Sequence, residues 1–263
     1  MDLAPPSSLR LSVVLPAFDE EGCVERLIRE ILSVTRPLAV PFEIVVTNDA
    51  SRDSTGAILD RLADELPELV VVHHAINCGL SAALATGLER ARGEIVVMMD
   101  GDEQADPHDI PALLAALQPD VDIVCGYRAR RLDDFVKRAS SKIGNGFRKL
   151  VTGDRVRDAG CTFRATRRDT LREIPVFNGM HRFLPTLYRY QGFRRVEVPV
   201  NHRPRTTGVS KFGIGNRMFR GVFDCFAMLW WRRRMLPARR VREEQLASRA
   251  EVRGAGSRVS AAR

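Results

Sequence analysis

The amino-acid sequence predicts an α/β fold, built on a mostly parallel, Rossmann-like sheet with helices on both faces. Apolar runs rich in Val and Ile alternate with segments that repeat apolar residues at helical spacing. These runs lack alternating polar residues, as strands buried on both faces do. Hydrophobic residues make up 44% of the 263 residues, which is enough for one full core.

The first predicted strands lie at 11–16 (LSVVLP) and 42–47 (FEIVVT), where β-branched residues favour extended backbone. A helix is expected at 20–34, because its apolar residues fall on one face: Val24, Leu27, Ile28, Ile31 and Leu32. A second helix is expected at 54–65, with Ile58, Leu59 and Leu62 facing inward. Strand and helix therefore follow one another from the start of the chain.

Three more strands are expected, at 69–74 (LVVVHH), 94–100 (EIVVMMD) and 121–127 (VDIVCGY). A helix of small residues at 79–91 and one at 108–117 separate them. Sheets of this kind bind ligands beyond the carboxyl ends of their strands. Polar motifs that directly follow strands are therefore the candidate functional residues.

Two basic amphipathic helices are predicted farther along, at about 132–151 and at 213–234. The second is rich in Phe, Met and Trp. Each can lie at a membrane interface or pack against the sheet or a partner subunit. The predicted division is an N-terminal extension (1–10), a main domain (11–212) that includes the first amphipathic helix, the C-terminal helix (213–234) and a basic tail (235–263).

Positive charge is concentrated at the end of the chain. Residues 232–263 contain ten Arg and three Glu, a net of +7 out of +8 for the whole chain. Such a tail can contact anionic lipid or nucleic acid, or remain solvated. Aromatic residues do not interleave with its arginines, so we expect no nucleic acid as a partner.

The cysteines and the apolar content indicate a reduced compartment without a membrane span. Five cysteines form no C-x-x-C pair, which supports neither a zinc site nor a disulfide framework. The N-terminus MDLAPPSSLR lacks an apolar signal core. The most apolar segment, 221–231, contains Asp224 and is shorter than the ~20 residues of a spanning helix.

An acidic turn, DGDEQ at 100–104, follows the predicted strand that ends at residue 100. Asp100 and Asp102 are two residues apart, so a turn can direct both carboxylates to one point. With the amide oxygen of Gln104 they form a set of hard ligands suited to Mg²⁺ or Mn²⁺. The alternative is an acidic loop without a metal, and D-x-D alone does not decide between the two.

Two further polar segments follow strands. In TNDASRDST (47–55), Asp49 ends a strand and can hydrogen-bond a base or ribose, whereas Ser51 or Asp53 can cap the next helix, and we favour Ser51 for that role. PAFDEE (16–21) brings a Pro, an Asp and a Glu to the same edge. Capping of the following helix by its acidic residues is the alternative there.

A basic loop, RPRTTGVSK at 203–211, precedes the second amphipathic helix. Its Arg, Gly, Ser and Lys suit phosphate oxygens, although a solvated loop is the alternative. Together the motifs place acids that can hold a metal and bases that can hold phosphates around one edge of the sheet.

The motifs resemble a known family. VLPAFDEE, VVTNDASRDST and NCGLSAALATGLERARGEIVVMMDGDEQADP resemble the GT-A domain of glycosyltransferase family 2. VCGYRARR, VRDAGCTFRATRR, GMHRFLP and EVPVNHRPRTTGVSKFG resemble its polyprenyl-phosphate branch, typified by dolichol-phosphate mannosyltransferases and bacterial undecaprenyl-phosphate sugar transferases. The match runs in order from about residue 11 to about residue 225, and it implies the GT-A fold for a catalytic domain at 11–212.

The resemblance implies a role for each matching residue. The implied metal ligands are Asp100, Asp102 and Gln104, and the implied catalytic residues are Asp102 and Arg205. The implied ligands of the nucleotide-sugar are Pro16, Glu20, Asp49 and Asp100. The implied ligands of the acceptor phosphate are Arg128, Arg138, Ser210 and Lys211. Asp158 matches an Arg-Asp pair of the family that can be structural.

The sequence also departs from the family pattern. Asn48 stands where the family has the first of two aspartates, and Phe18-Asp19 stand for a common Tyr-Asn. Thr162 replaces a frequent Gly. These positions bear on nucleotide preference more than on the reaction.

The implied reaction is inverting transfer of a sugar from a nucleotide-sugar, GDP-mannose or a UDP-sugar, to a polyprenyl phosphate. The implied partners are the donor, the lipid and the membrane surface, with a membrane-spanning subunit or a second copy as additions. The implied place is the cytoplasm, attached peripherally to the inner face of the cell membrane. Alternatives are transfer to a polysaccharide or another acceptor, nucleic-acid binding by the tail, and an inactive membrane subunit, which the intact DGDEQ disfavours.

Overall fold

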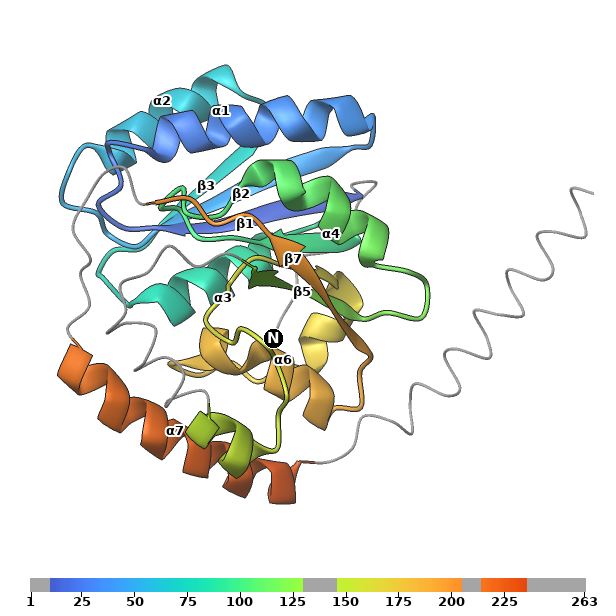
Figure 1. The fold of residues 1–263 in the computed structure, drawn as a ribbon. Coiled ribbons are helices and arrows are strands. Elements are labelled where there is room, and N and C mark those ends of the chain that lie inside the picture. Colours follow the sequence, from blue (N-terminus) through green and yellow to red (C-terminus); the bar gives the residue numbers. More distant parts are fainter. Residues whose placement is uncertain (1–9, 130–145, 205–213, 236–263) are drawn as a thin grey trace, which may run out of the picture.

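The computed structural model describes residues 10–129, 146–204 and 214–235, with the backbone alone at 214–221. A seven-stranded sheet in the order β3-β2-β1-β4-β6-β5-β7 forms its centre (Figure 1). The strands are β1 Leu11–Ala17, β2 Phe42–Asn48, β3 Leu69–His73, β4 Ile95–Met98, β5 Ile123–Arg128, β6 Arg164–Arg167 and β7 Arg195–Val200. Only β6 runs antiparallel to its neighbours, β4 and β5, so the predicted mostly parallel sheet is confirmed.

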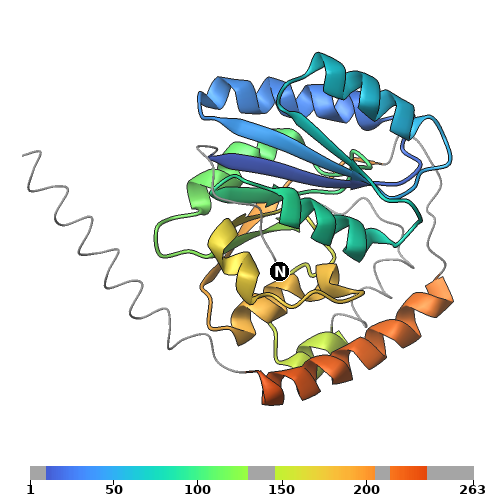
Figure 2. The same ribbon diagram turned by 180° about the vertical axis from the view of Figure 1, so that it is seen from behind.

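Helices cover both faces of the sheet, as Figures 1 and 2 show from opposite sides. One face carries α1 (Val24–Thr35), α2 (Thr55–Glu65) and α4 (Ile110–Ala116), and the other carries α3 (Leu80–Arg90) and α6 (Met180–Tyr190). Three short 3₁₀ helices are η1 Arg36–Leu38, η2 Pro107–Asp109 and η3 Arg168–Glu173. The long helix α7 (Ile214–Arg234) lies outside the α6 layer, away from α1 and α2.

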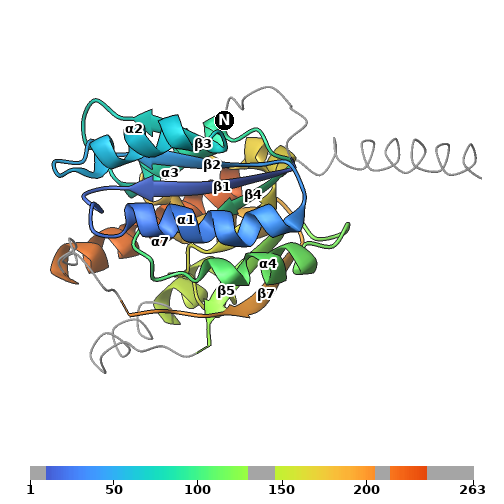
Figure 3. The same cartoon turned by 90° about the horizontal axis from the view of Figure 1, so that it is seen from above.

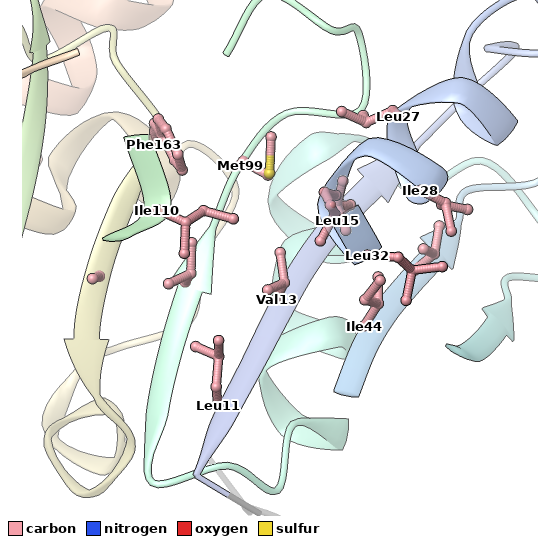
Figure 4. Close-up of a cluster of buried hydrophobic side chains, with 14 of the residues drawn as sticks. Leu11, Val13, Leu15, Leu27, Ile28, Leu32, Ile44, Met99, Ile110 and Phe163 are labelled. Atoms are coloured by element: carbon pink, nitrogen blue, oxygen red, sulfur yellow. The ribbon is translucent and has the colours of Figure 1, made fainter. Parts of the chain in front are cut away.

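The core divides along the sheet because successive strand side chains point to opposite faces. Val13 and Leu15 of β1 pack with α1, where Leu27 and Ile28 are fully buried (Figure 4). Val14, between them, belongs to the core on the other face, together with α3 and α6. Burial on both faces explains why these strands have uninterrupted apolar sequences.

Apolar side chains attach α7 to this second core. Its residues Cys225 and Met228 are buried there. The rings of Phe226 and Phe147 meet edge to face with centroids 6.1 Å apart, so the helical residues 146–152 pack on α7 as well. Among the described helices, none is long and apolar enough to cross a bilayer.

Turns with unusual backbone follow three neighbouring strands. Asp19, Ala50 and Glu103 have φ values of 51°, 55° and 60°, a region that residues other than glycine rarely adopt. They lie just beyond the carboxyl ends of β1, β2 and β4. Helix α1 accordingly begins at Val24 rather than at the predicted residue 20, because the preceding residues form such a turn. Backbone strain of this kind concentrates at functional sites.

Candidate active site

The carboxyl ends of β2, β1 and β4 lie side by side, because β1 pairs in parallel with both of the other strands. Figure 3 shows these strands next to one another from above. The segments PAFDEE, NDASRDST and DGDEQ therefore leave the sheet at one edge, as the sequence predicted. Ligand sites of open α/β sheets lie at such an edge.

Reciprocal hydrogen bonds join the loops after β1 and β2. Glu21 accepts from the Ser54 amide at 2.9 Å, while Asp53 accepts from the Glu21 amide at 3.2 Å. Asp53 also accepts from the amide of Thr55, the first residue of α2. The predicted cap at Ser51 was wrong, because its hydroxyl oxygen accepts from the amide of Asp19 instead.

The acidic residues after β1 do not cap α1 either. The residue before the helix is Cys23, and no side chain accepts a hydrogen bond there. Glu20 is buried, and its own amide donates to Thr55 Oγ1 at 2.8 Å. Pro16 lies beside the acidic turn after β4, where its carbonyl oxygen is 2.7 Å from the position that a Cβ on Gly101 would occupy. Only glycine lets the two segments approach so closely.

The carboxylate of Asp49 is buried and engaged with its own chain. It accepts from the amides of Cys78 (2.8 Å) and Gly79 (2.7 Å) and from Asn77 Nδ2 (3.0 Å). His74 Nδ1 lies 2.7 Å from the same carboxylate. Asp49 thus fixes the turn that begins α3 at the same edge, and its predicted contact with a nucleotide stays a prediction.

Asp100 and Asp102 lie half-buried on the turn after β4. The shape of the turn is fixed by Glu103, whose buried carboxylate pairs with the Arg26 guanidinium at 2.6 Å from Nε. Asp102 Oδ1 accepts from the amide of Gln104 at 3.2 Å. Asp100, Asp102 and Gln104 thus share one turn of backbone, and their role as metal ligands stays a prediction.

Burial, and then the charge of Asp102, raises the pKa of Asp100 to about 6. A hydrogen bond from Thr162 Oγ1 to Asp100 Oδ2, 2.6 Å long, opposes this rise. A carboxyl group whose charge is disfavoured by a neighbouring carboxylate is suited to a divalent cation, which compensates the charge of both. These oxygen donors fit Mg²⁺ or Mn²⁺.

We expect Asp100→Asn to stabilise the metal-free protein by about 1–2 kcal/mol near pH 7.5, measured by urea unfolding in EDTA. The raised pKa means that folding favours the protonated carboxyl. The protonated carboxyl stabilises the folded protein in full below about pH 4. This contribution to the free energy of unfolding is lost as the pH rises through about 6. The gain should vanish near pH 4, and a gain that is the same at both pH values would contradict this origin.

Two other groups of three ligating side chains lie within the described ranges, and both are engaged by the chain. One is Asp49 with His74 and Cys78, in the turn before α3. The other is Glu30 with Asp106 and His108. Arg203 binds Glu30 at 2.8 and 2.9 Å and Asp106 at 2.6 Å, so this second group serves as a structural ion cluster.

Arg203 also fixes the start of the predicted phosphate loop. Its amide donates to the carbonyl of Gln104 at 2.9 Å, and Ala105 forms an isolated bridge with His202. The segment that leads into residues 205–213 is thus attached to the acidic turn. Sequence reasoning missed this anchor, because Glu30 lies 173 residues from Arg203 in the chain.

Arg128, a predicted ligand of the acceptor phosphate, ends β5 and forms a two-point ion pair with Asp158. Its Nε lies 2.7 Å from Asp158 Oδ2 and its Nη2 lies 2.9 Å from Oδ1. Its contact with an acceptor stays a prediction. The other predicted phosphate ligands lie outside the described residues: Arg138, Arg205, Ser210 and Lys211.

A further polar cluster, formed by Ser81, Arg164 and His181 near the start of α3, was not predicted from the sequence. Ser81 Oγ lies 2.7 Å from His181 Nδ1 and accepts from the Gly179 amide at 2.8 Å. Arg164, fully buried in β6, donates to the carbonyl of His181 at 2.8 Å. Three of the family-like blocks contain these residues, but nothing in the sequence indicated that they meet, because tertiary contacts bring them together.

Known proteins show similarity to this chain. Residues 12–175 match the family model of glycosyl transferase family 2. A dodecaprenyl-phosphate galacturonate synthase of Rhizobium johnstonii is 32% identical over 87% of this chain and 69% of its own length. An undecaprenyl-phosphate 4-deoxy-4-formamido-L-arabinose transferase of Aeromonas hydrophila is 33% identical over 78% of this chain and 63% of its own length. The chain thus spans about two thirds of these relatives.

Similarity in structure agrees with the match in sequence. The glucosyl-3-phosphoglycerate synthase of Mycobacterium tuberculosis, solved with Mn²⁺, uridine diphosphate and phosphoglyceric acid, superposes with a TM-score of 0.62. It is 22% identical, over 85% of this chain and 78% of that chain. At this identity the similarity shows a shared fold.

Proposed function

Because this chain belongs to glycosyltransferase family 2, we propose that it transfers a sugar from a nucleotide-sugar to a polyprenyl phosphate. The observation that carries the proposal is the pair of half-buried carboxylates, Asp100 and Asp102, at the carboxyl edge of a GT-A sheet. The acceptor class is supported by the two curated relatives, whose names are those of polyprenyl-phosphate sugar transferases.

The donor is proposed to lie above β1 and β4, with its diphosphate toward the acidic turn. Pro16 and Glu20 lie at this edge, and Asp49 shapes the adjoining turn before α3. A divalent cation held by Asp100, Asp102 and Gln104 would supply Lewis-acid stabilisation of the leaving diphosphate. GDP-mannose and UDP-sugars both suit this arrangement.

The acceptor phosphate is proposed to attack the anomeric carbon from the face opposite the leaving group, which inverts the configuration. A phosphate monoester has a second pKa near ~6 and is largely dianionic at neutral pH, so a strong general base is not required. Donor and acceptor are both anions, and their approach needs positive charge between them. We assign this task to Arg128, Arg138, Arg205 and Lys211, and we assign to Ser210 a hydrogen bond to a phosphate oxygen.

The membrane-facing surface is proposed to be the outer side of α7, on the cytoplasmic face of the cell membrane. Phe223 and Trp230 are 73% and 59% exposed there, and Leu150 of the neighbouring helical residues is 83% exposed. The helix ends in the exposed arginines Arg232, Arg233 and Arg234. Aromatic and basic side chains on one surface are typical of helices that lie in a membrane interface.

A charge-matched pair of variants tests this surface. Replacing Arg232, Arg233 and Arg234 together with Gln should lower binding to vesicles with anionic lipid by about tenfold or more, because each arginine contributes ~1 kcal/mol near such a surface. Co-sedimentation with vesicles measures it. The control replaces three exposed arginines of the α1–α2 layer with Gln: Arg29, Arg36 and Arg61. Equal losses in both triple variants would contradict the assignment to α7.

The decisive experiment incubates the protein with a polyprenyl phosphate in detergent, Mg²⁺ and a panel of labelled UDP- and GDP-sugars. The proposal expects label to enter the organic phase for one donor, in a product that mild acid hydrolyses. Label that appears only on water-soluble glycan would favour the alternative, a family 2 transferase with a polysaccharide or other non-polyprenyl acceptor. No transfer with any donor would contradict both.

A further inference from the structure

A hydroxyl group contacts the acidic turn from another part of the chain. Thr162 Oγ1 donates to Asp100 Oδ2 at 2.6 Å, and both side chains are half-buried. Thr162 lies two residues before β6, and 62 positions separate it from Asp100 in sequence. We propose that Thr162 is a positioning residue, which fixes the orientation of the Asp100 carboxylate toward the divalent cation of the proposed function.

The backbone before Thr162 is held by an ion pair. Asp158 is buried and bound at two points by Arg128, at the end of β5. Asp158 also accepts from the amide of Gly160 at 3.2 Å, and its carbonyl accepts from the amide of Cys161 at 3.3 Å. These contacts hold the turn from which the Thr162 hydroxyl reaches Asp100.

The backbone after Thr162 is held by the sheet. Phe163 is fully buried, and its carbonyl accepts from the Gly126 amide at 2.9 Å. The next residue, Arg164, pairs with Met98 of β4, two positions before Asp100. Donor and acceptor of the hydrogen bond are therefore each two residues from the paired strands β4 and β6, whose ladder sets their relative position.

The hydrogen bond restricts what the carboxylate can do. It engages Oδ2 and limits rotation of the group. Within the described ranges no hydrogen bond engages Oδ1, whose lone pairs can accept a cation. A β-branched residue suits this task because few side-chain rotamers are open to it. Partners that orient a metal ligand typically change metal affinity by 10- to 100-fold when they are removed.

The test measures Mn²⁺ affinity directly, from the electron paramagnetic resonance of free Mn²⁺ titrated with protein in the presence of UDP. Thr162→Val keeps the shape and removes the hydroxyl, and it should weaken the Mn²⁺ affinity by about tenfold or more. Thr162→Ser keeps the hydroxyl and should remain within about threefold of the original protein. Thr162→Ala is measured in parallel, because it also lacks the hydroxyl but is smaller. A weaker Mn²⁺ affinity in both variants cannot then be due to poor packing of Val.

A matched control distinguishes positioning from general stability. Thr186, on α6, also donates from its Oγ1 to a buried carboxylate, Asp154 Oδ2, at 2.5 Å. Thr186→Val should lower the unfolding free energy and leave the Mn²⁺ affinity unchanged. If Thr162→Val and Thr162→Ala bind Mn²⁺ as tightly as the original protein, the positioning role is wrong.

This inference rests on the proposed metal site, and its failure can be distinguished from failure of the proposed function. Unchanged Mn²⁺ affinity in the Thr162 variants, with glycolipid still formed, overturns the inference alone. A protein that binds no Mn²⁺ with UDP overturns the inference together with the metal site. A specific loss in Thr162→Val, in a protein whose product is not a glycolipid, supports the positioning role and contradicts the proposed acceptor.

Discussion

Asp102→Asn is expected to lower kcat for sugar transfer by roughly a thousandfold, with the fold intact. The variant removes one of the two aspartates on the acidic turn and keeps the size of the side chain. Losing a single group that stabilises developing negative charge costs 10²- to 10³-fold in well-studied enzymes. Here the substitution would also weaken binding of the cation that would stabilise the leaving diphosphate.

The structure makes this substitution a sharp test. Asn keeps an oxygen that can accept from the Gln104 amide, so the turn itself should survive. Activity is measured with saturating donor and Mg²⁺, and circular dichroism checks the fold. Asp60→Asn, an exposed position on α2, is the control for loss of one negative charge. Activity of Asp102→Asn within tenfold of the original protein would refute the proposed metal site.

Arg205→Ala is expected to lower kcat by about a hundredfold while donor affinity changes less than about threefold. The arginine is proposed to act between donor and acceptor phosphates, where repulsion is greatest as the bond forms. A group that acts mainly in the transition state reduces kcat rather than binding. Single-turnover rates and donor dissociation constants are measured separately.

The setting of Arg205 strengthens this expectation. Arg203, two residues earlier, binds Glu30 and Asp106, and its amide is bonded to the acidic turn. The loop thus starts from an anchored position beside the proposed cation. Arg52→Ala, an exposed arginine in the loop after β2, controls for loss of positive charge at the same edge. Equal losses of kcat and donor affinity in Arg205→Ala would argue for a simple binding role.

The sequence predicted the strands that are buried on both faces and the helices that bury one apolar face. The apolar runs of β1 and β2 and the periodic residues of α1 indicate their structure locally. Strand β6, RATR, gave no such signal, because two of its four residues are arginines. Arg164 is buried there by donating to the carbonyls of His181 and Ala159, contacts that exist only after the chain has folded. Helix α6 was missed as well, and Pro185 inside it interrupts the usual pattern.

The candidate site shows the same division. Asp100 and Asp102 were found because a D-x-D pair follows an apolar run, and topology then brings them to the edge. The partners that hold them were not found, since Thr162 and Arg26 reach the turn across 62 and 77 positions of sequence. The contact of Asp49 with a nucleotide stays a prediction, and sequence reasoning did not find that its carboxylate also organises the turn before α3. The sequence pattern indicated which charged residues follow the strands. The tertiary contacts determine which partners those residues bind.

The antiparallel strand β6 also constrains how the protein is made. β5 does not pair with β4, since β6 lies between them and β7 follows on the far side of β5. Strands β1 to β4 can assemble from the first part of the chain to leave a ribosome. β5, with four buried residues, acquires its first sheet neighbour only after β6 has been synthesised. Until β6 is made, β5 has no strand beside it, and segments with unpaired strand edges are prone to aggregate.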